Sequence, residues 1–262
     1  MKNHFIFSYA GNKRNEVENL YNHIDLEGIE TIIETNCGSS ALCYYISTKH
    51  PKKYKYILND IDPNLIKIYK TLMNEEESKK LEIEVNKMID IFNKFKTDEE
   101  RKVYWEPIMK NQSDIYKYVF IKKYAVLNGR LMPLIERTKQ IKKLVLTDIP
   151  VYYFLNNENI IISEKTDINV IDEYKNDSTA LLFIDPPYIQ TNNTWYNTHD
   201  MNIYEYLYNN NINSFESKVY LILEKIWIIE LLFKSNSIVS NYNKTYQTGK
   251  KKTNHIIITK LI

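Results

Sequence analysis

The sequence predicts an α/β fold built around a parallel sheet, and three short runs of residues lead to that prediction. Residues 31–33, 54–58 and 180–184 are mostly apolar blocks that each end in a polar turn. Apolar runs of this length are typical of strands that are covered on both faces. Helix-like segments follow the first two runs, so the order is strand, helix, strand, helix. That order matches the first half of a nucleotide-binding α/β unit.

The composition excludes several classes of protein. With 44% hydrophobic and 26% charged residues the chain is not a disordered protein, and five glycines among 262 residues exclude a collagen-like one. A chain of this size buries roughly 75% of its unfolded surface, so it needs neither disulfides nor a metal to fold. Cys37 and Cys43 are its only cysteines, too few for a disulfide framework or a zinc site. We therefore expect no metal and a reduced, cytoplasmic setting.

The sequence also predicts a soluble protein with no membrane partner. The most apolar stretch, residues 219–233, contains Glu224, Lys225 and Glu230. A membrane span needs about 20 apolar residues with few charges, which this stretch does not supply. The apolar block at residues 5–7 is too short for a signal peptide.

Two helices are expected in the first part of the chain. Residues 40–48 follow the glycine turn after the first strand, and residues 63–73 follow the second strand. Asp62 is a suitable N-cap for the second helix, and a proline at position 63 suits its first turn.

The middle of the chain differs in charge and texture from its surroundings. Residues 74–106 are acidic with a helical apolar pattern, which indicates solvated helices. Residues 110–146 carry nine basic and two acidic side chains, a net charge of +7, although the whole chain is only +2. Aromatic residues are interleaved with that charge. The segment is either a surface for a phosphate backbone or a set of lysines that extend over helix surfaces with aromatics in the core.

The last third of the chain resumes the α/β pattern. Strands are expected at residues 160–163, 237–239 and 255–259, and a helix at residues 217–234. Residues 190–214 are rich in Asn, Thr and Tyr without an apolar period. We expect a long loop there, beside the end of the preceding strand, where lids are often found.

The segment Asp185-Pro186-Pro187-Tyr188 is the sharpest chemical feature of the sequence. Two consecutive prolines fix the backbone and remove two donors directly after a strand, so the carbonyls there are left to accept hydrogen bonds from a ligand. Such acceptors beside a carboxylate suit an amino group, and an aromatic ring can stack on a planar base. A plain turn that ends a strand is the alternative interpretation.

Three weaker features accompany this segment. Residues 34–40 form a loop around Gly38, with one glycine where dinucleotide-binding folds use three. Asp60 follows the second strand, 22 positions after Gly38, about where an acid binds a ribose diol in nucleotide-binding folds; it could equally be a helix cap. Lys13, in the loop at residues 9–14, could reach a ligand carboxylate.

Taken in order, these features resemble the Dam-type adenine-specific DNA methyltransferases. That family runs from an aromatic-Ala-Gly-Gly-Lys motif through Glu-Pro-Phe-x-Gly-x-Gly, Asn-Asp-x-Asn-x-x-Leu-Ile and a target-recognition insert to Asp-Pro-Pro-Tyr. The corresponding segments here are residues 9–13, 34–40, 59–66, 74–149 and 185–188. Residues 127–130 are similar to the family's Asn-Gly followed by a basic residue, and residues 237–242 to its later strand ending in Ser-Asn.

The resemblance implies a Rossmann-like class I methyltransferase fold with a mostly helical target-recognition insert. Residues 1–73 would be the first, cofactor-binding part of the catalytic domain. Residues 74–149 would be the insert, and residues 150–262 the second part of the catalytic domain, with the catalytic motif.

It also implies S-adenosylmethionine as the methyl donor, S-adenosylhomocysteine as the product, and an adenine flipped out of double-stranded DNA as the acceptor. Asp185 and the carbonyl of Pro186 would bind the adenine amino group, next to Pro187, and Tyr188 would stack on the base. Asp60 would bind the ribose, Lys13 the methionine carboxylate, and Glu34 with Gly38 would shape the loop. The residues expected to bind the cofactor are Tyr9, Lys13, Glu34, Gly38, Asp60, Asp167 and Asp185.

On the DNA side the resemblance implies contacts from the insert. The candidate DNA-binding residues are Lys122, Lys123, Asn128 and Arg130. A cognate restriction endonuclease is a candidate partner, and we expect a monomer or a weak dimer.

The sequence departs from the family pattern at a few positions. Asn12 and Ser40 replace glycines, and residues 35–37 replace Pro-Phe-x. Two alternatives stay open. One is a methyltransferase that modifies amino groups of RNA bases, because related Asp-Pro-Pro enzymes act on RNA with the same core; the other, which these departures suggest, is a catalytically degenerate relative that binds nucleic acid.

Overall fold

The computed structural model describes residues 3–9, 11–111, 113–124, 126–127, 130–131, 140–189, 202–245 and 252–260. The chain divides into two compact units. The sheet unit consists of Lys13–Ile66 and Glu158–Ile262, and the helical unit of Met1–Asn12 and Lys67–Asn157. Within the part of the chain that is described, we find no helix long and apolar enough to cross a membrane.

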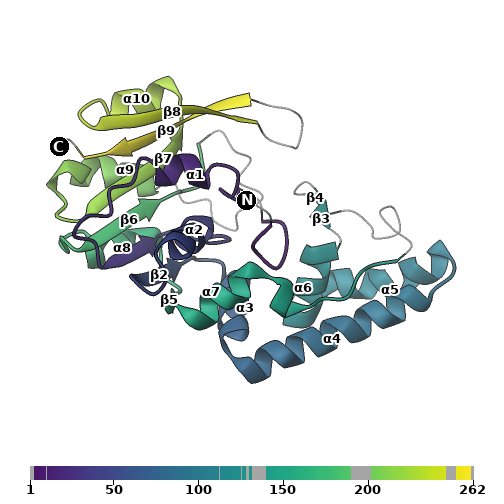
Figure 1. The fold of residues 1–262 in the computed structure, drawn as a ribbon. Coiled ribbons are helices and arrows are strands. Elements are labelled where there is room, and N and C mark those ends of the chain that lie inside the picture. The colour runs from purple at the N-terminus through teal and green to yellow at the C-terminus, as the bar shows by residue number, and fades with distance from the viewer. Residues whose placement is uncertain are drawn as a thin grey trace. The chain divides into compact units, whose positions relative to one another are not determined.

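The sheet unit is built on a mixed sheet with seven strands among its described residues, in the order β5-β2-β1-β6-β7-β9-β8 (Figure 1). Neighbouring strands from β5 to β7 are parallel, and β9 is antiparallel to both β7 and β8. The strands are β1 (Thr31–Glu34), β2 (Lys55–Asn59), β5 (Asn159–Ser163), β6 (Ala180–Ile184), β7 (Lys218–Glu224), β8 (Ser237–Thr245) and β9 (Lys252–Thr259).

The strand order reverses between β1 and β6, because the chain moves outward from β1 to β2 and β5, and in the opposite direction from β6 to β7. In such sheets ligands bind at the carboxyl ends of the strands, beside the reversal point. The predicted Rossmann-like α/β fold is therefore confirmed.

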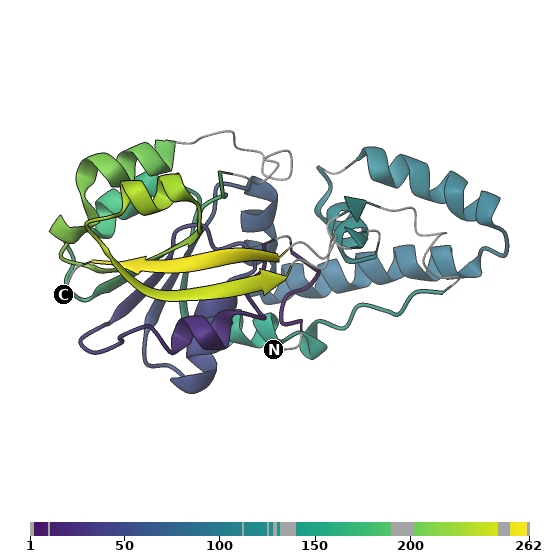
Figure 2. The same ribbon diagram turned by 90° about the horizontal axis from the view of Figure 1, so that it is seen from above.

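Helices cover both faces of this sheet. Figure 2 shows α1 and α2 on one side and α8, α9 and α10 on the other. They are α1 (Val17–Tyr21), α2 (Ala41–Lys49), α8 (Asp167–Tyr174), α9 (Asn202–Asn210), the 3-10 turn η4 (Ile212–Ser214) and α10 (Trp227–Leu232). Helix α3 (Pro63–Met73) begins in the sheet unit and ends in the helical unit, and Asp62 Oδ1 accepts from the amide of Asn64 (2.9 Å), as its predicted capping role requires.

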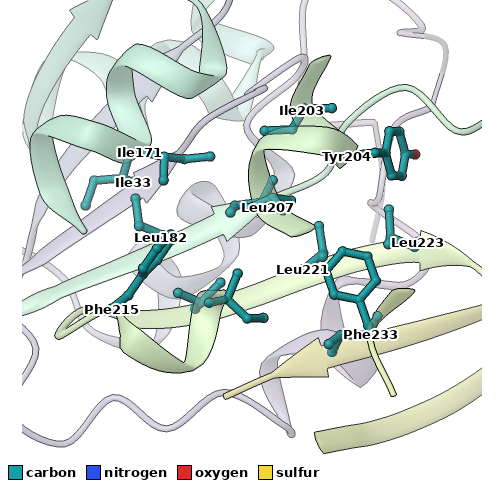
Figure 3. Packing of buried hydrophobic residues seen from close by; sticks show 14 of the residues in the cluster. Ile33, Ile171, Leu182, Ile203, Tyr204, Leu207, Phe215, Leu221, Leu223 and Phe233 are labelled. Atoms are coloured by element: carbon teal, nitrogen blue, oxygen red, sulfur yellow. The ribbon is translucent and has the colours of Figure 1, made fainter. Parts of the chain in front are cut away.

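The face covered by α8, α9 and α10 holds an extensive apolar core (Figure 3). Ile33 and Leu182 from neighbouring strands and Leu207 from α9 are at most 1% exposed there. Side chains alternate along a strand, so Ile32 contributes to the opposite face. Truncating a side chain such as Leu182 to Ala would cost about 2–5 kcal/mol.

Two of the expected elements are wrong. Residues 217–234 are not one helix, because Lys218–Glu224 form β7 in the middle of the sheet and only Trp227–Leu232 are helical. Within the expected loop at residues 190–214, Asn202–Asn210 form α9, which buries Ile203 and Leu207 in the core. Residues 190–201 lie outside the described part of the chain.

The helical unit is organised by the long helix α4 (Glu75–Lys94), which begins at a good cap. Asn74 Oδ1 accepts from the amide of Glu77 (3.0 Å), and three glutamates occupy the first turn, where the helix dipole favours negative charge. Residues at helical spacing, from Leu81 to Phe92, are fully buried. The other elements of this unit are α5 (Asp98–Lys110), α6 (Ile115–Tyr124), the short strand pair β3 (Val126–Leu127) and β4 (Arg130–Leu131), the 3-10 turn η2 (Leu146–Asp148) and α7 (Pro150–Asn157).

Two asparagines on α4 bind an extended segment of the helical unit through paired backbone hydrogen bonds. Asn86 donates to the carbonyl of Leu144 and accepts from its amide, both at 2.8 Å. Asn93 does the same with Ile141, at 2.9 and 3.0 Å. Each side-chain amide thus replaces a strand neighbour, and the backbone of the segment is satisfied without a sheet.

Candidate active site

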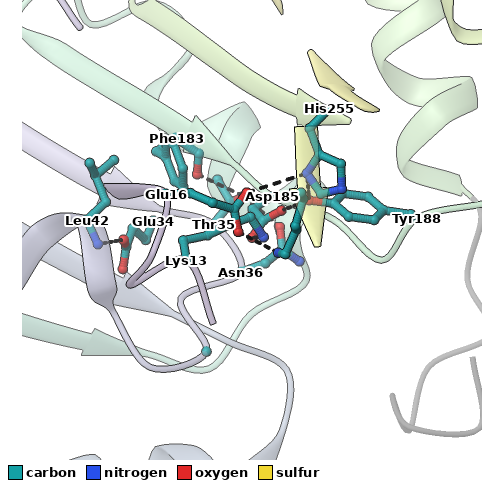
Figure 4. Close-up of polar contacts among 12 residues, drawn as sticks. Lys13, Glu16, Glu34, Thr35, Asn36, Leu42, Phe183, Asp185, Tyr188 and His255 are labelled. Atoms are coloured by element: carbon teal, nitrogen blue, oxygen red, sulfur yellow. Dashed lines mark hydrogen bonds and ion pairs between the residues drawn. The ribbon is translucent and has the colours of Figure 1, made fainter. Parts of the chain in front are cut away.

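The residues predicted to carry the chemistry converge at the carboxyl ends of β1, β2 and β6 in the sheet unit. Glu34 is the last residue of β1, and Asp60 and Asp185 directly follow β2 and β6. The carboxyl ends of parallel strands meet at one edge of a sheet, which is why residues far apart in the sequence lie together here. Figure 4 shows the polar contacts around Asp185.

Glu34 has a buried carboxyl group whose two oxygens differ in their hydrogen bonding. Its Oε1 accepts from the amides of Leu42 (3.0 Å) and Cys43 (3.3 Å) at the start of α2. Its Oε2 is buried and has no hydrogen-bond partner among the described residues. Burial raises the pKa of Glu34 to about 8, against the lowering effect of the two amides, and the nearby Asp185 carboxyl raises it further.

The loop after β1 is bound to both neighbouring strands. The amide of Cys37 donates to the carbonyl of Asn59 (2.7 Å), and the amide of Thr35 donates to that of Phe183 (3.1 Å). Gly38 and Ser40 have φ values of 49° and 46°, in the left-handed region. Ser40 therefore adopts the conformation that glycine favours, at a cost of roughly 1–2 kcal/mol.

Two more predicted acids contact this loop. Asp60 Oδ2 accepts from the amide of Gly38 (3.0 Å), and burial raises the pKa of its carboxyl group. Asp167, the first residue of α8, accepts through Oδ2 from the side-chain amide of Asn36 (3.3 Å). The structure thus brings Gly38, Asp60 and Asp167 together around one loop.

The two oxygens of Asp185 have different partners. Oδ2 forms an ion pair with Lys13 Nζ, and Oδ1 accepts from the hydroxyl of Tyr188 at 3.0 Å. The side chains of Lys13 and Asp185 are only 7% and 16% exposed, so the pair is largely shielded from water. The amine of Lys13 also lies over the ring of Tyr188, 5.4 Å from its centroid. The carbonyl of Pro187 accepts from the hydroxyl of Tyr204 (3.0 Å), a contact that orders the turn.

Sequence reasoning missed a buried polar cluster beside Tyr188. It consists of Glu16, which precedes α1, Tyr242 and Lys244 on β8, and His255 on β9. Oε1 of Glu16 forms an ion pair with Lys244 (2.5 Å). Its Oε2 accepts from the hydroxyl of Tyr242 and lies close to Nδ1 of His255. Burial raises the pKa of Glu16, but the hydrogen bond with His255 and the charges of Lys13 and Lys244 outweigh it and lower the pKa to about 2. No local motif marks these residues, which lie up to 239 positions apart.

The predicted DNA-binding residues belong to the helical unit. Lys122 Nζ lies over the ring of Tyr118 (5.2 Å), and Lys123 donates to the carbonyl of Ile6 (2.9 Å), where burial lowers the pKa of its amine. Arg130 is in β4. Asn128 lies outside the described residues.

Tyr9 also belongs to the helical unit, whereas the other residues predicted to bind the cofactor are in the sheet unit. Its ring packs edge-on against Phe5, with a centroid separation of 6.4 Å. The role of Tyr9 in cofactor binding stays a prediction.

The strand order is that of a Rossmann-like α/β fold, and a largely buried ion pair lies at the carboxyl end of β6. The model of the family described as D12 class N6 adenine-specific DNA methyltransferase matches residues 9–247. The chain belongs to this family, as the motif order predicted. It is therefore an S-adenosylmethionine-dependent, adenine-specific DNA methyltransferase, and DNA is its substrate.

Solved structures of methyltransferases align over most of the chain. The rRNA methyltransferase AviRa from Streptomyces viridochromogenes shows 10% identity and a TM-score of 0.38 over 94% of this chain and 83% of its own. A SAM-dependent O-methyltransferase from Thermotoga maritima shows 11% identity and a TM-score of 0.36 over 95% and 65%. The N-terminal domain of human METTL16 in complex with SAH shows 8% identity and a TM-score of 0.36, over 95% of this chain and 68% of its own. No curated protein matches the chain.

Proposed function

We propose that this chain methylates the N6 amino group of an adenine that is flipped out of duplex DNA, with Asp185 as the residue that binds the amino group. The proposal rests on the different partners of the two carboxylate oxygens of Asp185. Tyr188 holds one carboxylate oxygen, which leaves the other oxygen, Oδ2, for a cationic or amino donor.

The chemistry needs such an acceptor because the lone pair of an adenine amino nitrogen is delocalised into the ring. Hydrogen bonds to Asp185 Oδ2 and to the carbonyl of Pro186 would localise the lone pair on nitrogen and aim it at the methyl group. Positive charge develops on that nitrogen during transfer, and a fixed carboxylate stabilises it. Asp185 Oδ2 would also take the proton that the nitrogen then releases.

Lys13 occupies the place that we assign to the base. Its amine is paired with Asp185 Oδ2 and covers one face of the ring of Tyr188. We infer that Lys13 must leave both positions when the base enters. One movement would then expose the acceptor oxygen and the stacking ring, which is 6% exposed in this structure. The carboxylate of a bound cofactor is a second anion that could receive the amine of Lys13.

The residues around the glycine loop fit S-adenosylmethionine. When bound, it supplies a methyl group on a sulfonium centre, and it also carries an ammonium group and a ribose diol. Glu34 has a buried oxygen that no described residue hydrogen-bonds, which suits the ammonium group. Asp60 is half-buried beside Gly38 and suits the ribose hydroxyls. Asp167 remains our candidate for the adenine of the cofactor.

For the helical unit we propose target recognition, with Lys122 and Arg130 as contacts to DNA phosphates. The net charge of +7 over residues 110–146 supports this role. Lys123 is a weaker candidate, because its amine is already bonded to a carbonyl. A paired restriction endonuclease, a monomeric or weakly dimeric state and a cytoplasmic location stay predictions.

The test is incubation of the protein with unmethylated genomic DNA and labelled S-adenosylmethionine, followed by mapping of the modified bases. We expect label at N6 of adenine in a recurring sequence. Structured RNA and heat-denatured DNA serve as parallel substrates. Label only in RNA would replace the proposal by the RNA alternative. Absence of both transfer and cofactor binding in calorimetry would indicate the degenerate relative.

A further inference from the structure

The hydroxyl of Tyr188 has a second neighbour besides Asp185. His255 Nδ1 lies 3.4 Å from that oxygen, and the two rings meet edge to face with centroids 4.9 Å apart. His255 is fully buried and belongs to β9, 67 positions after the tyrosine. The turn at residues 185–188 therefore packs against a side chain of the β8–β9 hairpin.

The same nitrogen of His255 is also close to a carboxylate. Nδ1 lies 3.5 Å from Glu16 Oε2, and that oxygen accepts from the hydroxyl of Tyr242 (2.8 Å). The ring of Tyr242 packs against His255, with centroids 5.6 Å apart. Lys244 neutralises Glu16 through its other oxygen. Glu16 is thus held from two sides and presents one oxygen to the histidine.

Counting protons along these contacts gives the chain of hydrogen bonds a direction. A carboxylate can only accept, so the single proton of the Tyr188 hydroxyl is used by Asp185 Oδ1. The tyrosine oxygen must then accept from its other neighbour. Glu16 also requires a donor at the same nitrogen. One proton on His255 Nδ1, shared between the two oxygens at 3.4 and 3.5 Å, meets both demands.

We propose that His255, oriented by Glu16, is a positioning residue that donates from Nδ1 to Tyr188 and thereby fixes Asp185. With Oδ1 bound by the tyrosine, the carboxylate cannot rotate freely, and Oδ2 stays directed at the amino group. This inference rests on the proposed role of Asp185. It gives the hairpin at the edge of the sheet an indirect part in the reaction, because the hairpin helps to hold Asp185 in place. A displacement of about 1 Å at the reacting atoms can cost 10²-fold in rate.

The first experiment reads the proton directly and needs no activity. Long-range ¹H–¹⁵N NMR correlations of labelled protein distinguish the two tautomers of a histidine ring. His255→Asn identifies the signals of His255 among the five histidines. We expect a proton on Nδ1, and a shift of that signal in Tyr188→Phe. A neutral ring with its proton on Nε2 would overturn the proposal.

The second experiment separates positioning from folding through four variants. His255→Leu removes the donor, and we expect kcat to fall 10- to 100-fold, with the dissociation constant of S-adenosylmethionine within threefold of wild type. Asn carries an amide donor near the position of Nδ1, so His255→Asn should recover most of kcat. In a Tyr188→Phe background, His255→Leu should cause no further loss.

The matched control is His50→Leu. His50 follows α2 in the sheet unit and forms a comparable bond with the hydroxyl of Tyr21 (2.8 Å). We expect unchanged kcat in this variant. Normal kcat in a folded His255→Leu, or equal losses for Leu and Asn, would overturn the positioning role while Asp185 remains catalytic. If wild-type protein methylates no DNA, the proposed function fails, and the NMR experiment still decides the hydrogen-bond chain.

Discussion

The sheet unit buries some of its carboxyl groups, whereas the carboxyl groups that form ion pairs in the described part of the helical unit are mostly exposed. In the sheet unit, Glu16 and Glu34 are buried and Asp60 is half-buried; the pKa of Glu16 is lowered, and the pKa values of Glu34 and Asp60 are raised. In the helical unit, charged pairs such as Glu75–Lys79 and Glu84–Lys87 lie on exposed helix surfaces, three or four positions apart. The same residue types therefore meet very different solvation.

This difference indicates where the molecule uses charge for chemistry. Burying a charge costs several kcal/mol unless it is paired, so a fold keeps buried charges only where they form a defined arrangement. Exposed pairs on a helix contribute little and mainly keep the surface hydrated. The helical unit is instead held together by apolar contacts and by neutral bonds such as those of Asn86 and Asn93.

The largest expected effect in the sheet unit comes from Asp185→Asn. This change keeps the shape of the side chain but removes its charge and one acceptor oxygen. We expect kcat to fall by ~10³-fold or more, because fixed charge is a large part of transition-state stabilisation. Methyl transfer to DNA is the measurement, and cofactor binding should stay within a few fold. Asp172→Asn, at an exposed pair with Lys175, is the matched control. Transfer that persists in Asp185→Asn would refute the proposed mechanism.

Glu34→Gln tests the cost of a buried carboxyl group. The folded-state pKa of about 8 lies above the usual value near 4.5, so the folded chain keeps a proton that the unfolded chain has lost. Stability that is present below pH 4.5 is therefore lost as the pH rises toward 8, by an amount on the order of 5 kcal/mol. Urea unfolding at pH 5 and pH 8.5 should show this loss in wild type and a much smaller one in Glu34→Gln. The exposed Glu164→Gln should behave like wild type. Equal pH dependence in all three proteins would contradict the burial of Glu34.

Asn86→Ala tests whether neutral bonds hold the helical unit. The change leaves the amide and the carbonyl of Leu144 without their partner, which should cost about 1–3 kcal/mol. Chemical unfolding measures the loss, and hydrogen exchange at residues 141–144 should accelerate. Cofactor binding should be unaffected. Asn157→Ala, at an exposed bond to the carbonyl of Tyr153, is the control. An unfolding free energy equal to that of wild type would show that these bonds do not hold the segment.

The smallest effect is expected from Lys122→Ala. If this lysine contacts one DNA phosphate, the slope of log affinity against log salt becomes shallower by about 0.9, which corresponds to roughly threefold in affinity over a fourfold change in salt. Titration of duplex DNA at several salt concentrations measures this slope. Lys79→Ala, from an exposed pair on α4, provides the comparison. An identical slope for both variants would place the phosphate contacts elsewhere.

Much of the frame could be predicted, because short apolar runs and the motifs behind them are local signals. The failures came from segments whose local signal is ambiguous. Lys218–Glu224 are apolar enough for a strand or a helix, and only a place between β6 and β9 made them a strand. Helix α9 lies in a polar segment, and its buried residues Ile203 and Leu207 are four positions apart, a spacing that could have indicated it.

The sequence by itself determined the family, the cofactor and the residues at the ends of β1, β2 and β6, since motif order and strand ends are written along the chain. Only the tertiary structure decided their partners. The pairing of Lys13 with Asp185, and the contacts of Glu16 and His255 beneath Tyr188, join positions that are far apart in sequence. Burial also raises the pKa of Glu34, an effect that no local motif shows, because desolvation depends on what surrounds a group in space rather than on its neighbours in the chain.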